Sequence, residues 1–532
     1  MHRLTIDGRV VTVPAGATLL DAARQLGIHI PTLCHREGLP PGTSCMVCVV
    51  EVEGLRRLVP SCAYPARADL VVRTSTPAVL AARRTAVELL LSEHVGDCEG
   101  PCRRGCPANM DIPGMIRQIA AGRMEAALET VRQDIALPAV LGRICPAPCE
   151  KVCRRGKVDR PVSICLLKRL AGDCGVEEAG KRVAPETGRR VAIVGAGPAG
   201  LAAAFYLRRQ GHACALYDEQ SAPGGSLRVS LPAGRLPPDV LAREAEAILR
   251  CGVEFHAGVR VGQDVTLAEL RNTYDAVILA VGLIDAPRAA VLGVPFLQRG
   301  IQADSHTYVT PLPGVFAIGS AFRPLRMAVS ANADGRKAAV ACGQFLGGQP
   351  VTGETPPYHC VIGNLTPDEL RLELSRVSES QRIEPERGLQ AGFSLEEAVA
   401  EAARCLHCDC RRSTDCRLRE AARHLGAGRR SFGESGRHAV ELLHHPGGLV
   451  FEPGKCIKCG LCVRLTAQHS GIPGLTFIRR GFDTRVSPPV GETFETALAG
   501  VVAEVAALCP TGALVCDPVC NKNPMNAGES CP

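Results

Sequence analysis

Residues 190–200 read RVAIVGAGPAG, an apolar run that leads directly into a glycine-rich turn. The apolar run predicts a buried parallel strand, and the residues after Gly200 have the pattern of a helix. A second strand is predicted over 213–217, and it ends at Asp218. Glycines at such a turn let backbone N–H groups approach a pyrophosphate, while an acidic side chain can accept from ribose hydroxyls. The stretch therefore predicts a Rossmann-like domain that binds a dinucleotide.

The residues that follow favour FAD as that dinucleotide. Gly224-Gly225 and the string RLPPDVL resemble the FAD domain of the glutamate synthase small subunit rather than a plain NAD dehydrogenase. A bare NAD site, or a fold that has lost its ligand, is the alternative. One departure is Ser320, since the family has an aspartate there on the flavin ribityl chain, although serine can still hydrogen-bond. The resemblance implies the FAD-binding residues Gly195, Gly197, Pro198, Ala199, Gly200, Asp218, Gly224, Gly225, Arg235, Gly319 and Ser320.

The same family inserts a second Rossmann domain, which binds NADPH, between the two halves of the flavin domain. Here the string DAVILAVG at 275–282 resembles the exit into that insert, and 314–341 resembles the return. The roughly thirty residues between them are too few for a mononucleotide-binding fold and contain no GxGxxG. The sequence therefore predicts that the nicotinamide domain is missing.

Most of the 27 cysteines fall into spaced groups that are typical of iron–sulfur ligands rather than of disulfides. The first group follows a predicted hairpin at 4–13 and a helix that begins at Thr18. Its C-x10-C-x2-C-x13-C spacing resembles the β-grasp [2Fe–2S] domain of the complex I large subunit and of iron hydrogenases. Structural zinc is the alternative. The ligands would be Cys34, Cys45, Cys48 and Cys62.

The densest group flanks two short helices that the apolar period predicts within 112–132, on either side of Gly122. The strings GCPANMDIPGMI and GRICPAPCEKVC resemble the iron–sulfur domain of the glutamate synthase small subunit and dihydropyrimidine dehydrogenase, which implies two [4Fe–4S] clusters. By that resemblance one cluster takes Cys106, Cys145, Cys149 and Cys165, and the other takes His94, Cys98, Cys102 and Cys153.

A histidine enters this set because seven cysteines supply one ligand too few for two clusters. The complex I large subunit likewise places a histidine ligand before its cysteines. An ordinary surface histidine is the alternative for His94. Lys168 stands where a relative uses a side-chain amide, which favours Cys165 as the replacement ligand.

Two further groups lie near the C-terminus. A capping box at Ser394 predicts a helix that leads into a group which binds either [4Fe–4S] or structural zinc. The next group has a C-x2-C-x2-C triplet and a remote Cys-Pro, and it resembles half of a bacterial ferredoxin, with zinc again the alternative. The two groups are Cys405, Cys408, Cys410 and Cys416, and Cys456, Cys459, Cys462 and Cys509.

The other cysteines fit no ligand spacing and are predicted to be ordinary thiols, mostly buried as small apolar groups. They are Cys174, Cys214, Cys251, Cys342, Cys360, Cys516, Cys520 and Cys531.

Composition excludes several classes of function. The formal charge of +7 counts cysteines as neutral, whereas cluster sites would add negative charge, and tryptophan is absent, so nucleic-acid binding is not expected. No segment has the length and apolarity of a membrane span, and no export signal precedes the first strand, so a cytoplasmic location is expected. Motifs for hydrolysis or phosphoryl transfer are missing, and no catalytic residue is predicted.

The predicted fold class is multidomain, with α/β and α+β parts. The parts are a β-grasp [2Fe–2S] domain (1–78), a helical domain with two [4Fe–4S] clusters (79–185), a Rossmann-like FAD domain without a nicotinamide insert (186–350), a linker (351–393), a Cys-rich helical module (394–440), a [4Fe–4S] ferredoxin-like domain (441–516) and a flexible tail (517–532).

The predicted cofactors are FAD, one [2Fe–2S] cluster and about three to four [4Fe–4S] clusters. Because flavin exchanges electrons singly or in pairs and clusters carry one, the chain is predicted to be an electron-transfer subunit that relays electrons between partner redox subunits. A molybdenum or tungsten enzyme, a hydrogenase, an NADH-oxidising flavoprotein and ferredoxin are the candidate partners. The alternatives are a self-sufficient NAD(P)H oxidoreductase, similar to the glutamate synthase small subunit, and a scaffold subunit whose clusters only stabilise small modules.

Overall fold

The computed structural model describes residues 1–174, 183–375, 377–412, 414–429, 439–445 and 448–516. The chain forms two compact units. The first unit comprises Met1–Glu99, Pro357–Ser375 and Asp409–Pro532, and the second comprises Gly100–Pro356 and Arg376–Cys408. The predicted tail over 517–532, with Cys520 and Cys531, lies outside the described residues. In the part of the chain that is described, no helix has both the length and the apolar character needed to cross a membrane.

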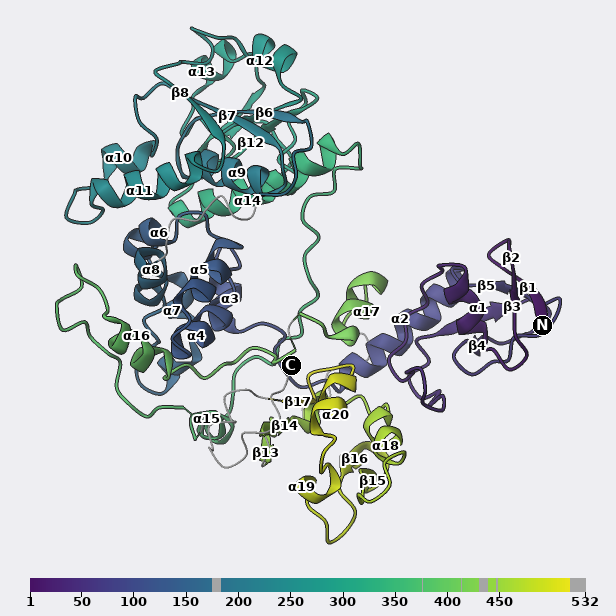
Figure 1. Cartoon of the computed structure of the whole chain (residues 1–532). Helices are drawn as coiled ribbons and strands as arrows, with labels where there is room; N and C mark the ends of the chain where they lie inside the picture. Colours follow the sequence, from purple (N-terminus) through teal and green to yellow (C-terminus); the bar gives the residue numbers. More distant parts are fainter. Residues whose placement is uncertain (175–182, 376, 413, 430–438, 446–447, 517–532) are drawn as a thin grey trace. The chain divides into compact units, whose positions relative to one another are not determined.

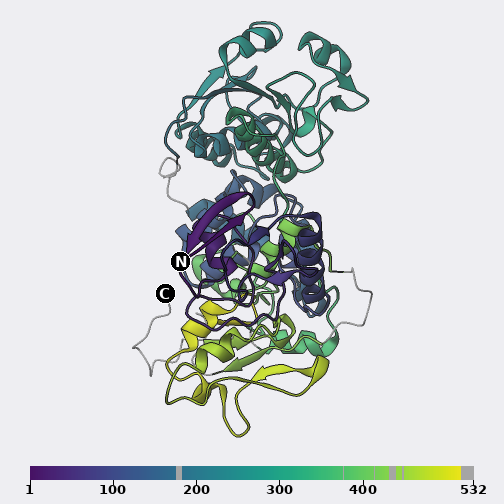
Figure 2. The same ribbon diagram turned by 90° about the vertical axis from the view of Figure 1, so that its right-hand side faces the viewer.

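The first unit begins with a mixed five-stranded sheet of order β2-β1-β5-β3-β4, the β-grasp arrangement that the sequence predicts. Strands β1 and β2 form the purple hairpin beside the N-terminus (Figures 1 and 2). Asp7 and Gly8 both have positive φ, 46° and 77°, as a type I′ turn requires. The predicted helix follows Thr18, whose capping box with Asp21 is formed. The elements are β1 His2–Ile6, β2 Arg9–Val13, α1 Leu19–Gln25, β3 Val49–Val52, β4 Val59–Pro60, β5 Val71–Arg73 and α2 Pro77–Ser92.

The rest of the first unit contains a three-stranded sheet of order β13-β14-β17 and the hairpin β15–β16. Its hydrophobic core is continuous with Leu33 and Leu39 of the N-terminal domain and with Val87 and Leu91 of α2. The elements are α15 Pro367–Leu374, α17 Arg417–Leu425, β13 Leu443–His445, β14 Leu449–Phe451, η5 Pro453–Lys455, α18 Leu461–Thr466, β15 Thr476–Ile478, η6 Gly481–Asp483, β16 Arg485–Ser487, α19 Phe494–Ala497, α20 Val502–Leu508 and β17 Leu514–Cys516.

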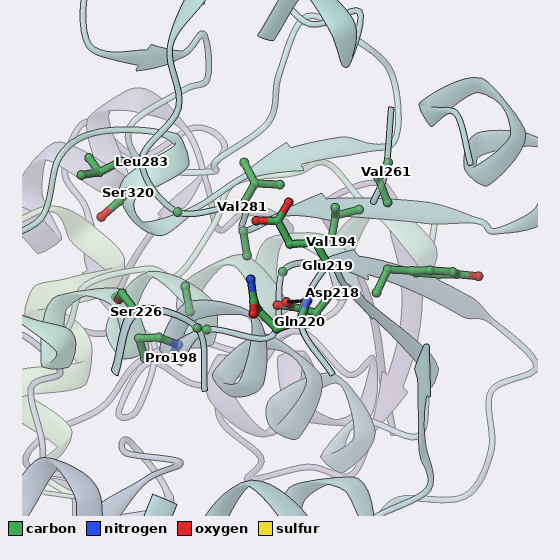
Figure 3. Close-up of a pocket in the computed structure, with 18 of the residues that line it drawn as sticks. Val194, Pro198, Asp218, Glu219, Gln220, Ser226, Val261, Val281, Leu283 and Ser320 are labelled. Carbon is green, nitrogen blue, oxygen red and sulfur yellow. Dashed lines mark hydrogen bonds between the residues drawn. The ribbon is translucent and has the colours of Figure 1, made fainter. Parts of the chain in front are cut away.

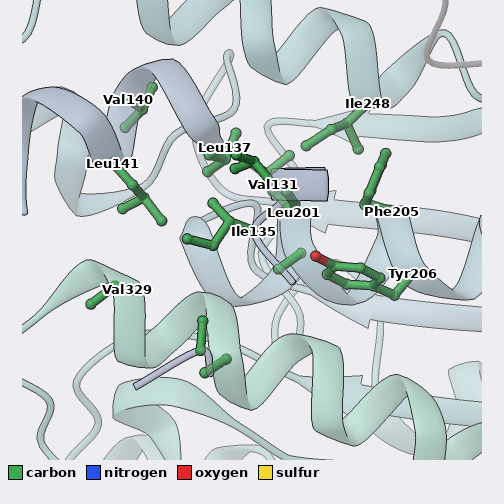
Figure 4. Close-up of a cluster of buried hydrophobic side chains, with 14 of the residues drawn as sticks. Val131, Ile135, Leu137, Val140, Leu141, Leu201, Phe205, Tyr206, Ile248 and Val329 are labelled. Carbon is green, nitrogen blue, oxygen red and sulfur yellow. The ribbon is translucent and has the colours of Figure 1, made fainter. Parts of the chain in front are cut away.

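The second unit begins with short helices. The two predicted within 112–132 are present, and Gly122 between them has a φ of +72° that an L side chain rarely adopts. Figure 4 shows Ile135 and Leu137 of this helical part in one core with Leu201 and Phe205 of the following domain. The elements are α3 Pro101–Gly105, α4 Ile112–Ala120, α5 Met124–Arg132, α6 Pro138–Ile144, α7 Pro148–Lys151, η1 Arg154–Lys157 and α8 Ile164–Cys174.

A parallel five-stranded sheet of order β12-β9-β6-β7-β8 follows. Alternate residues of β6 face two different cores: Val191 and Ile193 pack with α9 and α14, and Ala192 and Val194 pack with α12 and α13. The elements are β6 Arg190–Val194, α9 Pro198–Arg209, β7 Ala213–Asp218, α10 Ser226–Ser230, α11 Pro238–Leu249, β8 Val253–Ala257, α12 Leu267–Thr273, β9 Ala276–Leu279, α13 Ala286–Val291, β10 Phe296–Leu297, β11 Gly300–Ile301, β12 Val315–Ala317, η3 Gly319–Ala321, α14 Ala328–Leu346 and α16 Leu395–Ala402.

Two segments are divided differently from the sequence-based domains. The linker predicted over 351–393 separates into 357–375, which packs in the first unit and includes α15, and a remainder in the second. The module predicted over 394–440 separates after Cys408. Its first part is held in the second unit by the buried Arg404, and Leu418 of its second part joins the core of the first. Local sequence patterns do not reveal which distant core a short segment will join.

Candidate functional site

A cavity of about 450 Å³ lies where β6 and β7 end (Figure 3). The predicted residues that line it are Gly195, Gly197, Pro198, Ala199, Asp218, Gly225 and Ser320. The exits of parallel strands are the place where this class of sheet binds ligands. The structure therefore brings most of the predicted dinucleotide residues to one cavity.

The turn into α9 requires the absence of side chains. A Cβ atom at Gly195, where φ is +106°, would lie 2.4 Å from the carbonyl oxygen of Ala280. At Gly200 it would lie 1.9 Å from the carbonyl oxygen of Gly195, and at Gly225 it would lie 2.8 Å from the Gly197 Cα. No side chain caps the N-terminus of α9. Backbone N–H groups at such a helix start suit a pyrophosphate.

Two acidic residues at the end of β7 have different partners. Asp218 is buried, and its carboxylate accepts from the N–H groups of Ala196 at 2.6 Å and Gln220 at 2.8 Å. Glu219 forms ion pairs with Arg260 at 2.8 Å and Arg288 at 3.3 Å. A carboxylate has about four lone-pair positions, so Asp218 can hold the turn and still accept from a ribose. The two arginines also line the cavity, and no sequence motif marks them.

The remaining predicted FAD residues lie outside the cavity lining. Gly224 and Gly319 allow close packing, since a Cβ there would lie 2.8 Å from Leu241 and 2.9 Å from Ala199. Arg235 donates to the carbonyl oxygen of Ile144 at 3.3 Å. Its role in binding FAD stays a prediction.

In the second unit, Lys168 marks one group of predicted cluster ligands. Burial lowers the pKa of this lysine, but the charges of four thiols outweigh burial and raise it. The Cys145 thiol donates a hydrogen bond to Cys165 in the same place, and this bond raises the pKa of Cys145. The four thiols around Lys168 are Cys165, Cys145, Cys106 and Cys149, the set that the sequence assigns to one cluster.

The second unit also holds Cys102, Cys153, Cys405 and Cys408. Cys405 belongs to its hydrophobic core, against which Cys102 and Cys153 pack. Arg155 donates to the carbonyl oxygen of Arg404 at 3.1 Å, which ties the segment after Cys153 to the segment before Cys405.

In the first unit, the thiols of the predicted [2Fe–2S] group form two pairs. The sulfur atoms of Cys48 and Cys62 are 3.4 Å apart. A hydrogen bond from Cys45 lowers the pKa of Cys34 to about 5. All four thiols are buried, as ligands of a shielded cluster would be.

The predicted ligands of the ferredoxin-like group line one small cavity, which is walled by apolar residues such as Leu461 and Val486. Burial raises the pKa of Cys456 to about 11, and the charge of Cys509 adds to this effect. The remote Cys-Pro therefore lies with the triplet, as the sequence predicts. The four thiols are Cys456, Cys459, Cys462 and Cys509.

His94 is buried rather than a surface histidine, with 8% of its surface exposed. Its Nδ1 atom has no hydrogen-bond partner among the described residues. Burial lowers the pKa of His94 to about 3, and Lys455 adds to the effect, so the imidazole is neutral. A neutral imidazole whose Nδ1 atom has no partner among the described residues fits a metal ligand, but the role of His94 as a ligand stays a prediction.

No disulfide joins any two of the described cysteines. In the described ranges, no three histidine, cysteine, aspartate or glutamate side chains form a group that could hold a metal ion as they stand. Cluster ligands surround a core of several iron and sulfur atoms. The candidate sites are therefore defined by thiol pairs, by a common cavity and by shared charged neighbours.

Four family models match separate parts of the chain. They are a 2Fe-2S cluster-binding domain over residues 1–77, domain II of dihydropyrimidine dehydrogenase with a 4Fe-4S cluster over 92–179, an NAD(P)-binding Rossmann-like domain over 193–236, and the ferredoxin-like domain of NADH-quinone oxidoreductase subunit 3 over 449–515. These matches confirm the predicted iron–sulfur domains and the Rossmann-like domain.

Similar curated proteins are subunits of redox enzymes. The beta subunit of NADP(+)-dependent formate dehydrogenase from Moorella thermoacetica is 42% identical over 36% of this chain and 31% of its own length. The beta subunit of NADPH-Fe(3+) oxidoreductase from Geobacter sulfurreducens is 40% identical over 38% and 30%. Dihydropyrimidine dehydrogenase subunit PreT from Salmonella typhimurium is 38% identical over 39% and 53%. The predicted resemblance is confirmed, and the chain spans about a third to a half of these relatives.

Among solved structures, an NAD+-reducing [NiFe]-hydrogenase is 32% identical over 23% of this chain and 48% of that chain, with a TM-score of 0.17.

Proposed function

We propose that this chain is an electron-transfer subunit that carries electrons between FAD and partner redox subunits through several iron–sulfur clusters. The observation that carries the proposal is the position of Arg464 in the first unit. Its guanidinium donates to the carbonyl oxygen of Cys34 at 2.8 Å and to that of Cys459 at 3.4 Å. One side chain thus joins the loop of the predicted [2Fe–2S] site to the loop of the ferredoxin-like site. Neighbouring clusters of this kind suit a relay better than isolated structural metals.

FAD is the proposed dinucleotide of the second unit. The glycine-lined turn, the uncapped start of α9 and the carboxylate of Asp218 support it. Bound FAD would supply exchange of electrons singly or in pairs. The chain's own residues would bind and orient it: the N–H groups after Gly197 at the pyrophosphate, Asp218 at a ribose and Ser320 at the ribityl side.

The chain is not expected to oxidise NADPH by itself. Between β9 and β12, residues 283–313 form only α13 and the two-residue strands β10 and β11. A hydride donor needs an oriented site beside the flavin, and this segment offers no second parallel sheet to build one. The partners would then supply or accept the electrons; a molybdenum or tungsten enzyme, a hydrogenase, an NADH-oxidising flavoprotein and ferredoxin remain the candidates. Cysteines that are not joined in disulfides among the described residues suit a reducing compartment such as the cytoplasm.

Anaerobic titration of the purified chain tests this proposal. NADPH, NADH and then dithionite are added while flavin absorbance and cluster EPR signals are recorded, with iron, zinc and FAD measured on the same sample. Reduction of every centre by dithionite and of none by the nicotinamides is the expected result. Prompt bleaching of the flavin by NADPH would instead support a self-sufficient oxidoreductase. Zinc in place of iron, or clusters that dithionite leaves oxidised, would support a scaffold.

A further inference from the structure

A third group of thiols gathers in the first unit, and its members come from three separate segments. The N–H of Cys360 donates to the sulfur of Cys98 at 3.2 Å, and the N–H of Cys98 donates back to the Cys360 carbonyl at 3.1 Å. The N–H of Cys410 donates to the Cys98 carbonyl at 3.4 Å. All three residues are buried. Cys98 is therefore held between Cys360 and Cys410, although the sequence separates the three widely.

Arg419 brings Cys416 to the same place. Helix α17 begins directly after Cys416, and Arg419 lies in its first turn. Arg419 donates to the Tyr358 carbonyl oxygen at 2.7 Å. It also forms an ion pair with Glu99 at 2.7 Å. One guanidinium thus ties the start of α17 to the segment of Cys360 and to the segment of Cys98. Cys416 also lies within electrostatic reach of the thiols of Cys410 and Cys98.

A buried cation faces these thiols. Lys455 is buried, pairs with Glu452 at 2.7 Å and lies within electrostatic reach of Cys410. A Cβ atom at Gly96 would lie 2.5 Å from the Lys455 Cε, so the lysine packs on the loop that leads to Cys98. Four thiolates around a cluster leave a net negative charge, which a buried cation stabilises.

We propose that Cys98, Cys410 and Cys416 are three ligands of one [4Fe–4S] cluster in the first unit, and that Cys360 is the fourth. The sequence-based grouping is changed in two places, because it joined Cys98 to Cys102 and it joined Cys410 and Cys416 to Cys405 and Cys408. The thiols left in the second unit, Cys102, Cys153, Cys405 and Cys408, would then hold a separate cluster. Both changes coincide with boundaries between the units, after Glu99 and after Cys408. Cys360, predicted to be an ordinary thiol, becomes a ligand.

The position of Lys455 gives this site a place in the relay. The residue after Lys455 is Cys456, a predicted ligand of the ferredoxin-like site. Arg464 joins that site to the [2Fe–2S] loop. The first unit would thus carry three neighbouring clusters, with the ferredoxin-like one in the middle.

Iron counting on paired variants of the full chain tests the grouping. Cys98→Ser, Cys410→Ser and Cys405→Ser should each lose about four iron atoms per chain, because each variant removes one of the thiolates that hold a cubane. The Cys98→Ser/Cys410→Ser pair should lose about four, and the Cys405→Ser/Cys410→Ser pair about eight. The reverse pattern, about eight for the first pair and about four for the second, would overturn the grouping.

The choice of Cys360 rather than His94 as the fourth ligand needs a separate test, because the two residues are neighbours. The Cys360 sulfur lies 3.8 Å from the His94 carbonyl oxygen. Cys360→Ser should alter the EPR signal that Cys98→Ser abolishes, and His94→Gln should leave that signal in place. Pulsed EPR should detect no strongly coupled imidazole nitrogen on this cluster. A nitrogen coupling that disappears in His94→Gln would overturn the assignment of Cys360.

Two controls distinguish the loss of one cluster from the loss of the whole fold. FAD content reports on the second unit, so a variant with full FAD and reduced iron has lost a cluster rather than its whole fold. Cys214→Ser changes a buried thiol of the second unit that fits no ligand group, and it should keep all iron. The inference rests on the proposed function only in requiring that the chain carries clusters. A wild-type chain without iron would refute that premise. The inference itself would be refuted by the reverse pattern of iron loss in the two paired variants.

Discussion

The two units build their candidate sites by different means. In the second unit, the nucleotide cavity depends on the main chain, because Gly195 and Gly200 lie against carbonyl oxygens at distances that no side chain could share. In the first unit, the cluster loops are joined by cationic side chains, the buried Lys455 and the half-buried Arg464. This comparison indicates that adding a single Cβ atom should disrupt the nucleotide cavity of the second unit, while removing a single charge should disrupt the cluster sites of the first unit.

The largest effect is expected at Lys455. Lys455→Met removes a cation but keeps most of the side-chain volume, and it leaves Glu452 with Arg411 as its remaining partner at 3.0 Å. Loss of one member of a buried ion pair should cost about 3–5 kcal/mol of unfolding free energy. The potential of the cluster beside Cys410 should fall as well, because the reduced state gains negative charge. Thermal unfolding and an EPR redox titration measure the two effects.

Lys458→Met is the matched control. Lys458 pairs with Glu93 at 3.5 Å, and 30% of its side chain is exposed, so the loss should be about 0–1 kcal/mol. Equal losses of unfolding free energy in the two variants would show that the buried Lys455 has no special role.

Gly200→Ala tests the main-chain side of the comparison. Alanine would gain about 1 kcal/mol of helix propensity in α9, but its Cβ would overlap the Gly195 carbonyl oxygen. The steric overlap should outweigh the gain in helix propensity. The expected result is a net loss of about 2–3 kcal/mol of unfolding free energy and of most bound FAD. FAD content and thermal unfolding measure this change. Gly234→Ala, where a Cβ meets nothing within 4 Å, should stay within about 0.5 kcal/mol of the parent chain.

The second unit also contains a buried carboxyl group, that of Glu244, whose titration should make the stability of the protein depend on pH. Burial raises the pKa of Glu244 to about 7, although it accepts from the N–H groups of Ala139 and Val140 at 2.8 Å. The folded state therefore binds this proton more tightly than the unfolded state does. The contribution of Glu244 to stability should be largest below about pH 4.5, and it should fall by about 2–3 kcal/mol between pH 5 and pH 8.

The temperature of FAD release between pH 5 and pH 8 measures this slope. Glu244→Gln should reduce this slope, while Glu246→Gln, on the same helix and 66% exposed, should leave it unchanged. Burial also raises the pKa of Asp134 to about 6, so a smaller slope should remain in Glu244→Gln. A slope of the same size in Glu244→Gln and in the parent chain would assign the proton to another group.

The smallest effect is expected at Arg464. Arg464→Met removes the donors to the carbonyl oxygens of Cys34 and Cys459 and should cost about 1–2 kcal/mol. The magnetic interaction between the two reduced clusters should weaken, which EPR line shapes report. Gln468→Ala removes an exposed bond to Gly38 at 3.0 Å, and it should change stability by about 0.5 kcal/mol without altering the line shapes. Identical line shapes in both variants would show that Arg464 does not set the cluster spacing.

Sequence patterns predicted well where the determining contacts are local. The turn at Asp7-Gly8, the capping boxes at Thr18 and Ser394 and the break at Gly122 are formed as predicted, because each depends on residues a few positions apart. The ferredoxin-like thiols also meet in one cavity, since the triplet fixes three of them. Arg260 and Arg288 were missed, because their position beside Glu219 depends on how β7, β8 and α13 pack.

The sequence by itself determined the kinds of modules and the chemistry of their ligands: a β-grasp domain, a Rossmann-like sheet and thiols at cluster spacing. Only the tertiary structure decided which distant thiols share a place. Cys98, Cys360 and Cys410 meet through main-chain hydrogen bonds between segments that local patterns cannot relate. The physical reason is that strand and helix signals arise within a few residues, whereas the partner of a buried thiol is chosen by the packing of whole segments into one core or the other.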